Sequence, residues 1–216
     1  MSDKFNQIYQ KSINNPEEFW KDAAEDIFWF KKPTKILNKS NPPFYKWYED
    51  GVTNTCYNAL DIHIDQGKGD KTALIYDSPI TGNKSKFTYE ELRSKVSKFA
   101  GALKDQGVNK GDRVIIYMPM IPEAVVAMLA CARIGAIHSV VFGGFASNEL
   151  ASRIDDSKAK LLVTASCGFE PGRTVEYKPL VDEAVKQATH KISKMILFQR
   201  KGHEVKLNAP MEISWD

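Results

Sequence analysis

From residue 72 onward, short apolar runs alternate with segments in which apolar residues recur every three to four positions. Uninterrupted apolar runs of five or six residues are typical of strands buried on both faces, which occur in parallel sheets covered by helices. The pattern therefore predicts an α/β fold with a parallel sheet. Its strands are expected near residues 72–76, 113–118, 138–142, 161–165 and 195–199.

Helices are expected between these strands. Thr88 followed by Glu91 is the signature of a capping box, and helical spacing of apolar residues continues from there to Gly107. The segment 123–134 is apolar nearly all round, so we expect this helix to be buried on several sides. Two further helices are predicted near residues 148–156 and 180–188.

The first 70 residues have a different character. They contain three of the four tryptophans and show little alternation of strands with helices. Asn15 and Pro16 read as the N-cap and first position of a helix that continues to about Phe30. Aromatic residues gather at 44–48, where packing is the ordinary role and a ligand-stacking surface is the alternative. We therefore predict a helical and irregular lead-in over residues 1–70, followed by an α/β subdomain over residues 71–216.

Composition excludes several classes of protein. Hydrophobic residues make up 43% and charged residues 26% of the chain, as in folded water-soluble domains. The net charge of +3 is spread evenly and does not favour a nucleic-acid partner. The three cysteines show no CxxC spacing, which argues against a disulfide framework or a zinc site. Since no membrane span or leader is visible, a cytoplasmic location and no membrane partner are expected.

Familiar catalytic motifs are absent from the sequence. It contains no P-loop, no dinucleotide glycine fingerprint, no zinc-protease motif and no nucleophile elbow. The four histidines are scattered, and His138 is expected to be a core histidine at the start of a buried strand. The sequence therefore predicts no catalytic residue and no metal ligand.

One candidate binding element is the turn Phe142, Gly143 and Gly144. It follows a predicted strand and precedes a predicted helix, so it should lie at the carboxyl edge of the sheet, where doubly wound folds bind ligands. Paired glycines allow the backbone to approach a ligand closely. A tight connection without a ligand is the alternative.

The second candidate is the loop formed by Glu170, Pro171, Gly172 and Arg173, which follows the strand at 161–165. Glycine and proline would hold the guanidinium in a rigid turn, where it could bind a phosphate with two hydrogen bonds. A surface salt bridge between Arg173 and Glu170 is an equally good interpretation.

A resemblance to a known family chooses between these interpretations. KGDRVIIYMPMIPEAVVAMLACARIGAIHSVVFGGFASNELASRIDD, at residues 110–156, resembles the acetyl- and propionyl-CoA synthetases of the adenylate-forming ligase superfamily. The likeness continues in YNALDIHID (57–65), TALIYDSP (72–79) and FTYEEL (87–92), and covers practically the whole chain. After LLVTA, acetyl-CoA synthetases are expected to have an Arg-Ala-Gly-Arg element. This chain has ASCGFEPGR, which is similar to the propionyl-CoA synthetase and short-chain acyl-CoA synthetase-3 branch.

The resemblance implies a two-step ligase reaction. A carboxylate and Mg-ATP form an acyl-adenylate and pyrophosphate, after which the sulfur of CoA attacks the acyl carbon and AMP leaves. Propionate is the expected acid, and an acetate-specific enzyme is the alternative. The family's polyphosphate loop and C-terminal domain would follow this segment. We therefore expect an N-terminal part that is inactive alone, binds ATP, CoA and Mg²⁺ only weakly, and has the rest of its own chain as a partner besides small substrates.

The resemblance also implies where CoA binds. Its nucleotide is expected against Phe142, Gly143 and Gly144 and against the loop of residues 170–173. Arg173 matches the second arginine of the family's pair, whereas Glu170 stands in the place of the first. This departure removes one of two cationic contacts to the 3′-phosphate of CoA.

A function of another class is the alternative to a ligase: a non-catalytic nucleotide-binding or interaction module.

Overall fold

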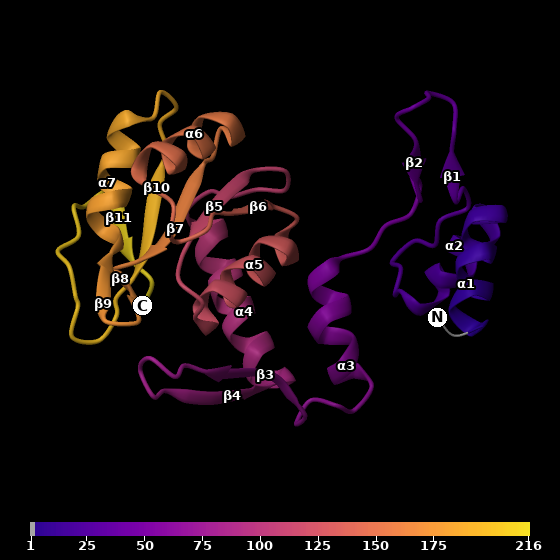
Figure 1. Ribbon diagram of the computed structural model, residues 1–216, viewed down its shortest axis with the longest axis horizontal. Helices are drawn as coiled ribbons and strands as arrows, with labels where there is room; N and C mark the ends of the chain where they lie inside the picture. Colours follow the sequence, from indigo (N-terminus) through magenta and orange to yellow (C-terminus); the bar gives the residue numbers. More distant parts are fainter. Residues whose placement is uncertain (1–2) are drawn as a thin grey trace. The chain divides into compact units, whose positions relative to one another are not determined.

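The computed structural model describes residues 3–216 and forms two compact units, which divide between Asn54 and Thr55 (Figure 1). A short π-helical turn, η2 (Tyr57–Asp61), continues into α3 (Ile62–Asp65) at the start of the second unit. Cys56 and Leu60 are buried in the core of that unit, which is why its boundary precedes the change of sequence pattern at residue 70.

A parallel five-stranded sheet lies at the centre of the second unit and confirms the predicted fold class. Its order is β11-β10-β7-β5-β6. The strands are β5 (Arg113–Tyr117), β6 (Ile137–Val140), β7 (Leu161–Ala165), β10 (Lys194–Phe198) and β11 (Glu212–Ser214). The sequence pattern did not assign β11, because a strand of three residues is too short to show a period.

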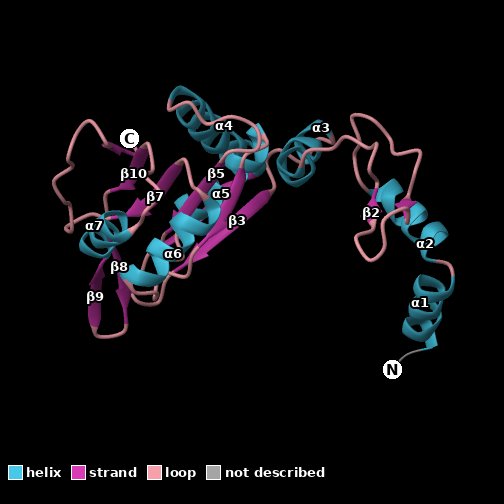
Figure 2. Ribbon diagram, turned by 90° about the horizontal axis from the view of Figure 1, so that it is seen from above, coloured by secondary structure: helices cyan, strands magenta, loops and turns pink. Residues whose placement is uncertain are grey.

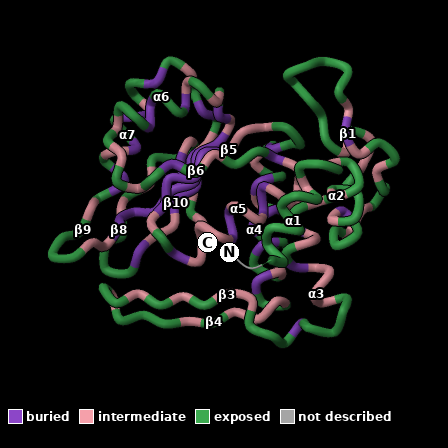
Figure 3. The backbone as a smooth tube through the Cα atoms, turned by 45° about the vertical axis from the view of Figure 1, so that its right-hand side comes forward, coloured by how far each residue is buried: buried purple, intermediate pink, exposed green. Residues whose placement is uncertain are grey.

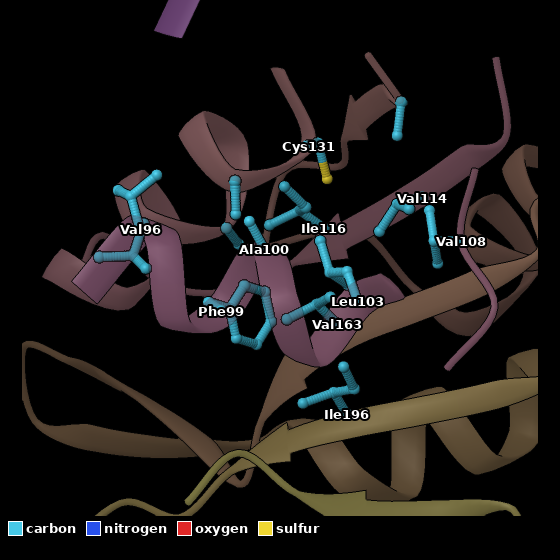
Figure 4. Packing of buried hydrophobic residues seen from close by; sticks show 14 of the residues in the cluster. Val96, Phe99, Ala100, Leu103, Val108, Val114, Ile116, Cys131, Val163 and Ile196 are labelled. Carbon is cyan, nitrogen blue, oxygen red and sulfur yellow. The ribbon is translucent and has the colours of Figure 1, made fainter. Parts of the chain in front are cut away.

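Helices cover both faces of this sheet, and alternate residues of β5, β7 and β10 enter opposite cores. On β5, Val114 and Ile116 enter the core with α4 (Tyr89–Asp105) and α5 (Pro122–Ile134), which Figure 4 shows from close by. Ile115 and Tyr117 enter the core with α6 (Ser147–Ser157) and α7 (Tyr177–Gln187). Because both faces are covered, no residue of β7 is exposed.

The ends of α4 follow from local chemistry, as the sequence predicted. The Thr88 hydroxyl accepts from the Glu91 backbone N–H at 3.2 Å, and the Glu91 carboxylate accepts from the Thr88 N–H at 2.8 Å. Beyond the other end, Gly107 has a φ of +80°, a conformation that glycine adopts without strain. The predicted capping box and helix stop are confirmed.

The strand predicted at 72–76 exists as β3 (Thr72–Asp77), but its place in the parallel sheet was wrong. It pairs antiparallel with β4 (Lys84–Thr88) in a separate two-stranded sheet. Ile75 is exposed, while Leu74 packs against the α4 side of the core. Figure 3 shows this alternation of exposed and less exposed positions along the hairpin, in contrast to the buried central strands. The largely apolar run at residues 72–76 therefore did not imply burial on both faces.

The prediction for His138 was also wrong. The strand β6 lies at the edge of the sheet and pairs only with β5, so His138 is exposed rather than part of the core. Ile137 and Val140 of the same strand are exposed as well.

The first unit comprises the described residues up to Asn54. It contains α1 (Asp3–Asn14), α2 (Pro16–Ala23), a 3-10 turn η1 (Ala24–Asp26) and the antiparallel pair β1 (Leu37–Asn38) and β2 (Lys46–Trp47). The helix predicted to reach Phe30 ends at Ala23 because the chain tightens into the 3-10 turn. Tryptophan rings pack here, with Trp20 and Trp47 centroids 6.1 Å apart. No helix among the described residues is long and apolar enough to cross a membrane.

Candidate ligand-binding cleft

The order of the strands shows where a ligand is expected to bind. Numbered along the chain, the five strands lie in the order 2-1-3-4-5, so the direction of winding reverses between β5 and β7. All strands are parallel, and their carboxyl ends therefore meet at one edge. Doubly wound sheets bind ligands outside this edge at the point of reversal.

A cleft of about 390 Å³ lies at this edge. The segments after β5, β6 and β7 line it, and so does the turn between β3 and β4. The lining consists of residues 76–81, 118–121, 140–144 and 168–170, together with Tyr177 and Arg200. The tertiary structure thus brings the predicted glycine turn and part of the predicted arginine loop into one site.

The glycine turn packs against the Tyr177 side chain. A Cβ atom at Gly143 would lie 2.0 Å from the Tyr177 hydroxyl oxygen, and one at Gly168 would lie 3.0 Å from it. Tyr117 supports the turn from the sheet, since its hydroxyl donates to the Phe145 carbonyl at 2.7 Å. Glycine is therefore required at residue 143 by close packing. Gly144 and Phe142 also line the cleft, and Phe142 is 71% exposed.

The predicted arginine loop is a β-hairpin, which Figure 2 shows extending from the end of the sheet. The strands β8 (Cys167–Glu170) and β9 (Arg173–Glu176) are joined through Pro171 and Gly172, and Gly172 has a φ of +75°. Arg173 is exposed, and its Nε donates to Glu170 Oε2 at 2.7 Å. The salt bridge that the sequence left open is therefore present. Of the four loop residues, Glu170 alone belongs to the cleft lining.

Sequence reasoning missed Tyr177 and Arg200. Arg200 follows β10 at the carboxyl edge, and its guanidinium lies over the Phe169 ring at 4.6 Å. Tyr177 opens α7, and its ring centroid lies 4.9 Å from that of Tyr117. The pKa of Tyr177 is raised to about 12, mainly by burial, so its hydroxyl stays protonated at neutral pH. The signal in the sequence that could have identified Arg200 as a cleft residue is its position directly after the strand predicted at 195–199.

The cysteines and the acidic residues offer little chemistry. Cys56, Cys131 and Cys167 are buried free thiols, and burial raises the pKa of each, for Cys131 to about 12. They are therefore poor nucleophiles at neutral pH. Within residues 3–216, no group of three or more histidine, cysteine or acidic side chains could hold a metal ion.

Comparisons with known proteins agree with this fold. A family model described as AMP-binding enzyme matches residues 62–212, and one described as acetyl-coenzyme A synthetase N-terminus matches residues 5–59. The chain is 54% identical to human acyl-CoA synthetase short-chain family member 3, mitochondrial, over 96% of this chain and 30% of that protein. It is 45% identical to an acetyl-coenzyme A synthetase of Streptomyces avermitilis, over 97% of this chain and 32% of that protein.

A solved structure is also similar. The acetoacetyl-CoA synthetase from Streptomyces lividans matches with a TM-score of 0.84 at 25% sequence identity, over 95% of this chain and 31% of that one. The chain thus spans about 30% of the length of the curated relatives it matches. These matches do not favour the non-catalytic module that the sequence left open.

Proposed function

The chain belongs to the AMP-binding enzyme family, and from this premise we propose that the whole protein is a short-chain acyl-CoA synthetase. The observation that carries the proposal is the cleft at the point where the winding of the sheet reverses, with the paired glycines in its wall. Identity of 54% to a relative described as a short-chain acyl-CoA synthetase supports the choice of reaction.

In the proposed reaction, the carboxylate attacks the α-phosphate of ATP, forming an acyl-adenylate and releasing pyrophosphate. The CoA thiolate then attacks the acyl carbon, and the bond to AMP breaks. We assign this chain a share in binding the CoA nucleotide. Gly143 and Gly144 present backbone at the cleft, and the exposed Phe142 ring offers a face on which a base can stack. The described residues contain no cluster of ligands for the Mg²⁺ that accompanies ATP, so we propose no Mg²⁺ ligand among them.

Propionate is the acid that we propose, with acetate as the alternative. Support comes from the segment after β7, which reads SCGFEPGR where acetyl-CoA synthetases are expected to have two arginines. The whole protein should form propionyl-CoA, AMP and pyrophosphate, with kcat/KM about tenfold higher for propionate than for acetate, since one methylene contributes about 1–3 kcal/mol in an apolar pocket. Coupled pyrophosphate release measures this. Preference for acetate would favour the alternative, and release with neither acid would contradict the proposed function.

We propose that Arg173 binds the 3′-phosphate of CoA after leaving Glu170, its partner at 2.7 Å. In the whole protein, Arg173→Ala should raise the KM for CoA by roughly ten to a hundred fold, as expected for one charge-assisted hydrogen bond. Pyrophosphate exchange should be nearly unchanged, because it precedes the thiol step. With dephospho-CoA, the variant and the wild type should have equal KM values. A loss of exchange at unchanged KM for CoA would instead give Arg173 a structural role.

The matched control for this prediction is Glu170→Gln, which releases Arg173 from its ion pair. It should lower the KM for CoA or leave it unchanged.

The proposed location is the cytoplasm, and cell fractionation tests it. Co-purification with mitochondria would contradict this location and would agree with the name of the human relative.

A further inference from the structure

Arg200 occupies a fixed position at the cleft. Its backbone N–H donates to the Ser166 hydroxyl at 2.9 Å, and its carbonyl accepts from the His203 N–H at 2.9 Å. The guanidinium stacks on Phe169, 4.6 Å from the ring centroid, and the residue is only 9% exposed. Backbone and ring thus hold this charged group where it lines the cleft.

The guanidinium has no protein acceptor among residues 3–216: no ion pair or hydrogen bond from its nitrogens is present. The two carboxylates in the cleft lining are already paired, Asp77 with Lys84 at 2.8 Å and Glu170 with Arg173 at 2.6 Å. Lys178, which is similarly buried, differs because two carboxylates bind its ammonium. The nitrogens of Arg200 still reach the solvent of the cleft, so a ligand with suitable acceptors can replace water at the five donors of this guanidinium.

Tyr177 supplies a second donor without a partner. The residue is 5% exposed and lines the same cleft, yet its hydroxyl makes no hydrogen bond within the described chain. The hydroxyl of neighbouring Tyr117, by contrast, donates to a backbone carbonyl. Both glycines that contact the Tyr177 hydroxyl, Gly143 and Gly168, also line the cleft. An arginine and a tyrosine from different elements therefore present unused donors to one space.

We propose that Arg200 and Tyr177 form an anion subsite that binds a phosphate group of a nucleotide substrate. A cleft of about 390 Å³ is larger than an isolated anion requires, which favours a phosphate carried by a larger molecule. The choice of a nucleotide rests on the proposed function. ATP and CoA both carry such phosphates, and the experiment separates these two sources.

The test is an NMR titration of the 216-residue chain with ATP, CoA and dephospho-CoA, following the Arg200 Nε–H signal. One of the nucleotides should shift this signal. Arg200→Gln should then raise the dissociation constant of that nucleotide by roughly ten to a hundred fold, and Tyr177→Phe by roughly two to tenfold. If Arg200→Gln weakens CoA and dephospho-CoA equally, the subsite is assigned to the pyrophosphate of CoA, whereas a loss confined to CoA assigns it to the 3′-phosphate.

Lys201→Gln is the matched control. Lys201 is the next residue along the chain, its side chain is exposed, and it does not line the cleft, so this variant removes the same charge outside the proposed subsite. It should change the dissociation constant less than about twofold. Tyr177→Phe keeps the ring that packs on the glycines, so it tests the subsite even if Arg200→Gln fails to fold.

Three results would overturn the inference. If CoA or ATP shifts the Gly143 and Gly144 amides but not the Arg200 signal, the subsite is wrong while the proposed function stands. The same holds if Tyr177→Phe and a folded Arg200→Gln variant both bind like the wild type. If no nucleotide shifts any signal of the wild-type chain at millimolar concentration, both the subsite and the proposed role of this cleft in CoA binding are wrong.

Discussion

Lys178→Met is expected to lower the free energy of unfolding by about 3–5 kcal/mol, the cost of breaking a buried ion pair from one side. The residue is 6% exposed, and its Nζ lies 2.6 Å from Asp182 on the same helix and 3.1 Å from Glu212 on β11. Because Glu212 is buried too, the variant leaves a carboxylate without its cation. Urea unfolding followed by circular dichroism measures the loss.

Two comparisons test the reason for this loss. Lys178→Met combined with Glu212→Gln should recover most of the stability, because the unpaired charge is then gone. Lys84→Met removes an exposed partner of Asp77 and should cost less than about 1 kcal/mol. If Lys178→Met costs no more than Lys84→Met, burial of the pair does not stabilise the fold as we infer.

The pH dependence of this pair has a definite sign. Burial opposes the charge on Lys178, but the hydrogen bonds to Asp182 and Glu212 outweigh it and raise the pKa above the usual 10.5. A raised pKa in the folded state gives stability that is fully present below the unfolded pKa and is lost as pH rises through the folded pKa. The difference between wild type and Lys178→Met should therefore narrow only above about pH 10.5.

Gly143→Ala is expected to lower the free energy of unfolding by about 3 kcal/mol, at the upper end of the usual cost of overpacking. The new Cβ would lie 2.0 Å from the Tyr177 hydroxyl oxygen. That oxygen cannot move away easily, because the Tyr177 ring is buried against Gly168 and Tyr117. Thermal unfolding monitored by calorimetry measures the effect.

Neighbouring positions provide the controls for this prediction. Gly144→Ala meets the Phe142 ring at 2.6 Å, but that ring is exposed and can rotate away, so the cost should stay below about 0.5 kcal/mol. Adding Tyr177→Phe to Gly143→Ala removes the oxygen at 2.0 Å but leaves the ring carbon Cζ at 2.9 Å, so part of the loss should be recovered. Equal effects of Gly143→Ala and Gly144→Ala would show that packing against Tyr177 is not what requires glycine.

Much of the fold was predictable because its signals are local. The capping box at Thr88 and Glu91 needs only four consecutive residues, and β7 shows its burial in its own composition. The sequence pattern predicts the segments that became β3 and β6 as strands of the same parallel sheet. Their different places, in a separate hairpin and at the sheet edge, depend on which strands pair with them, and this is a property of distant residues.

The candidate site divides in the same way. By itself, the sequence determined the glycine turn at the carboxyl edge, since a strand, two glycines and a helix follow one another along the chain. Only the tertiary structure decided that Arg173 pairs with Glu170 and that Arg200 stacks on Phe169, a residue 31 positions earlier. Whether an arginine is paired depends on the acceptors that folding brings near it. Which acceptors lie near an arginine is decided by the pairing of strands and by burial, and the residues beside the arginine in the sequence do not show it.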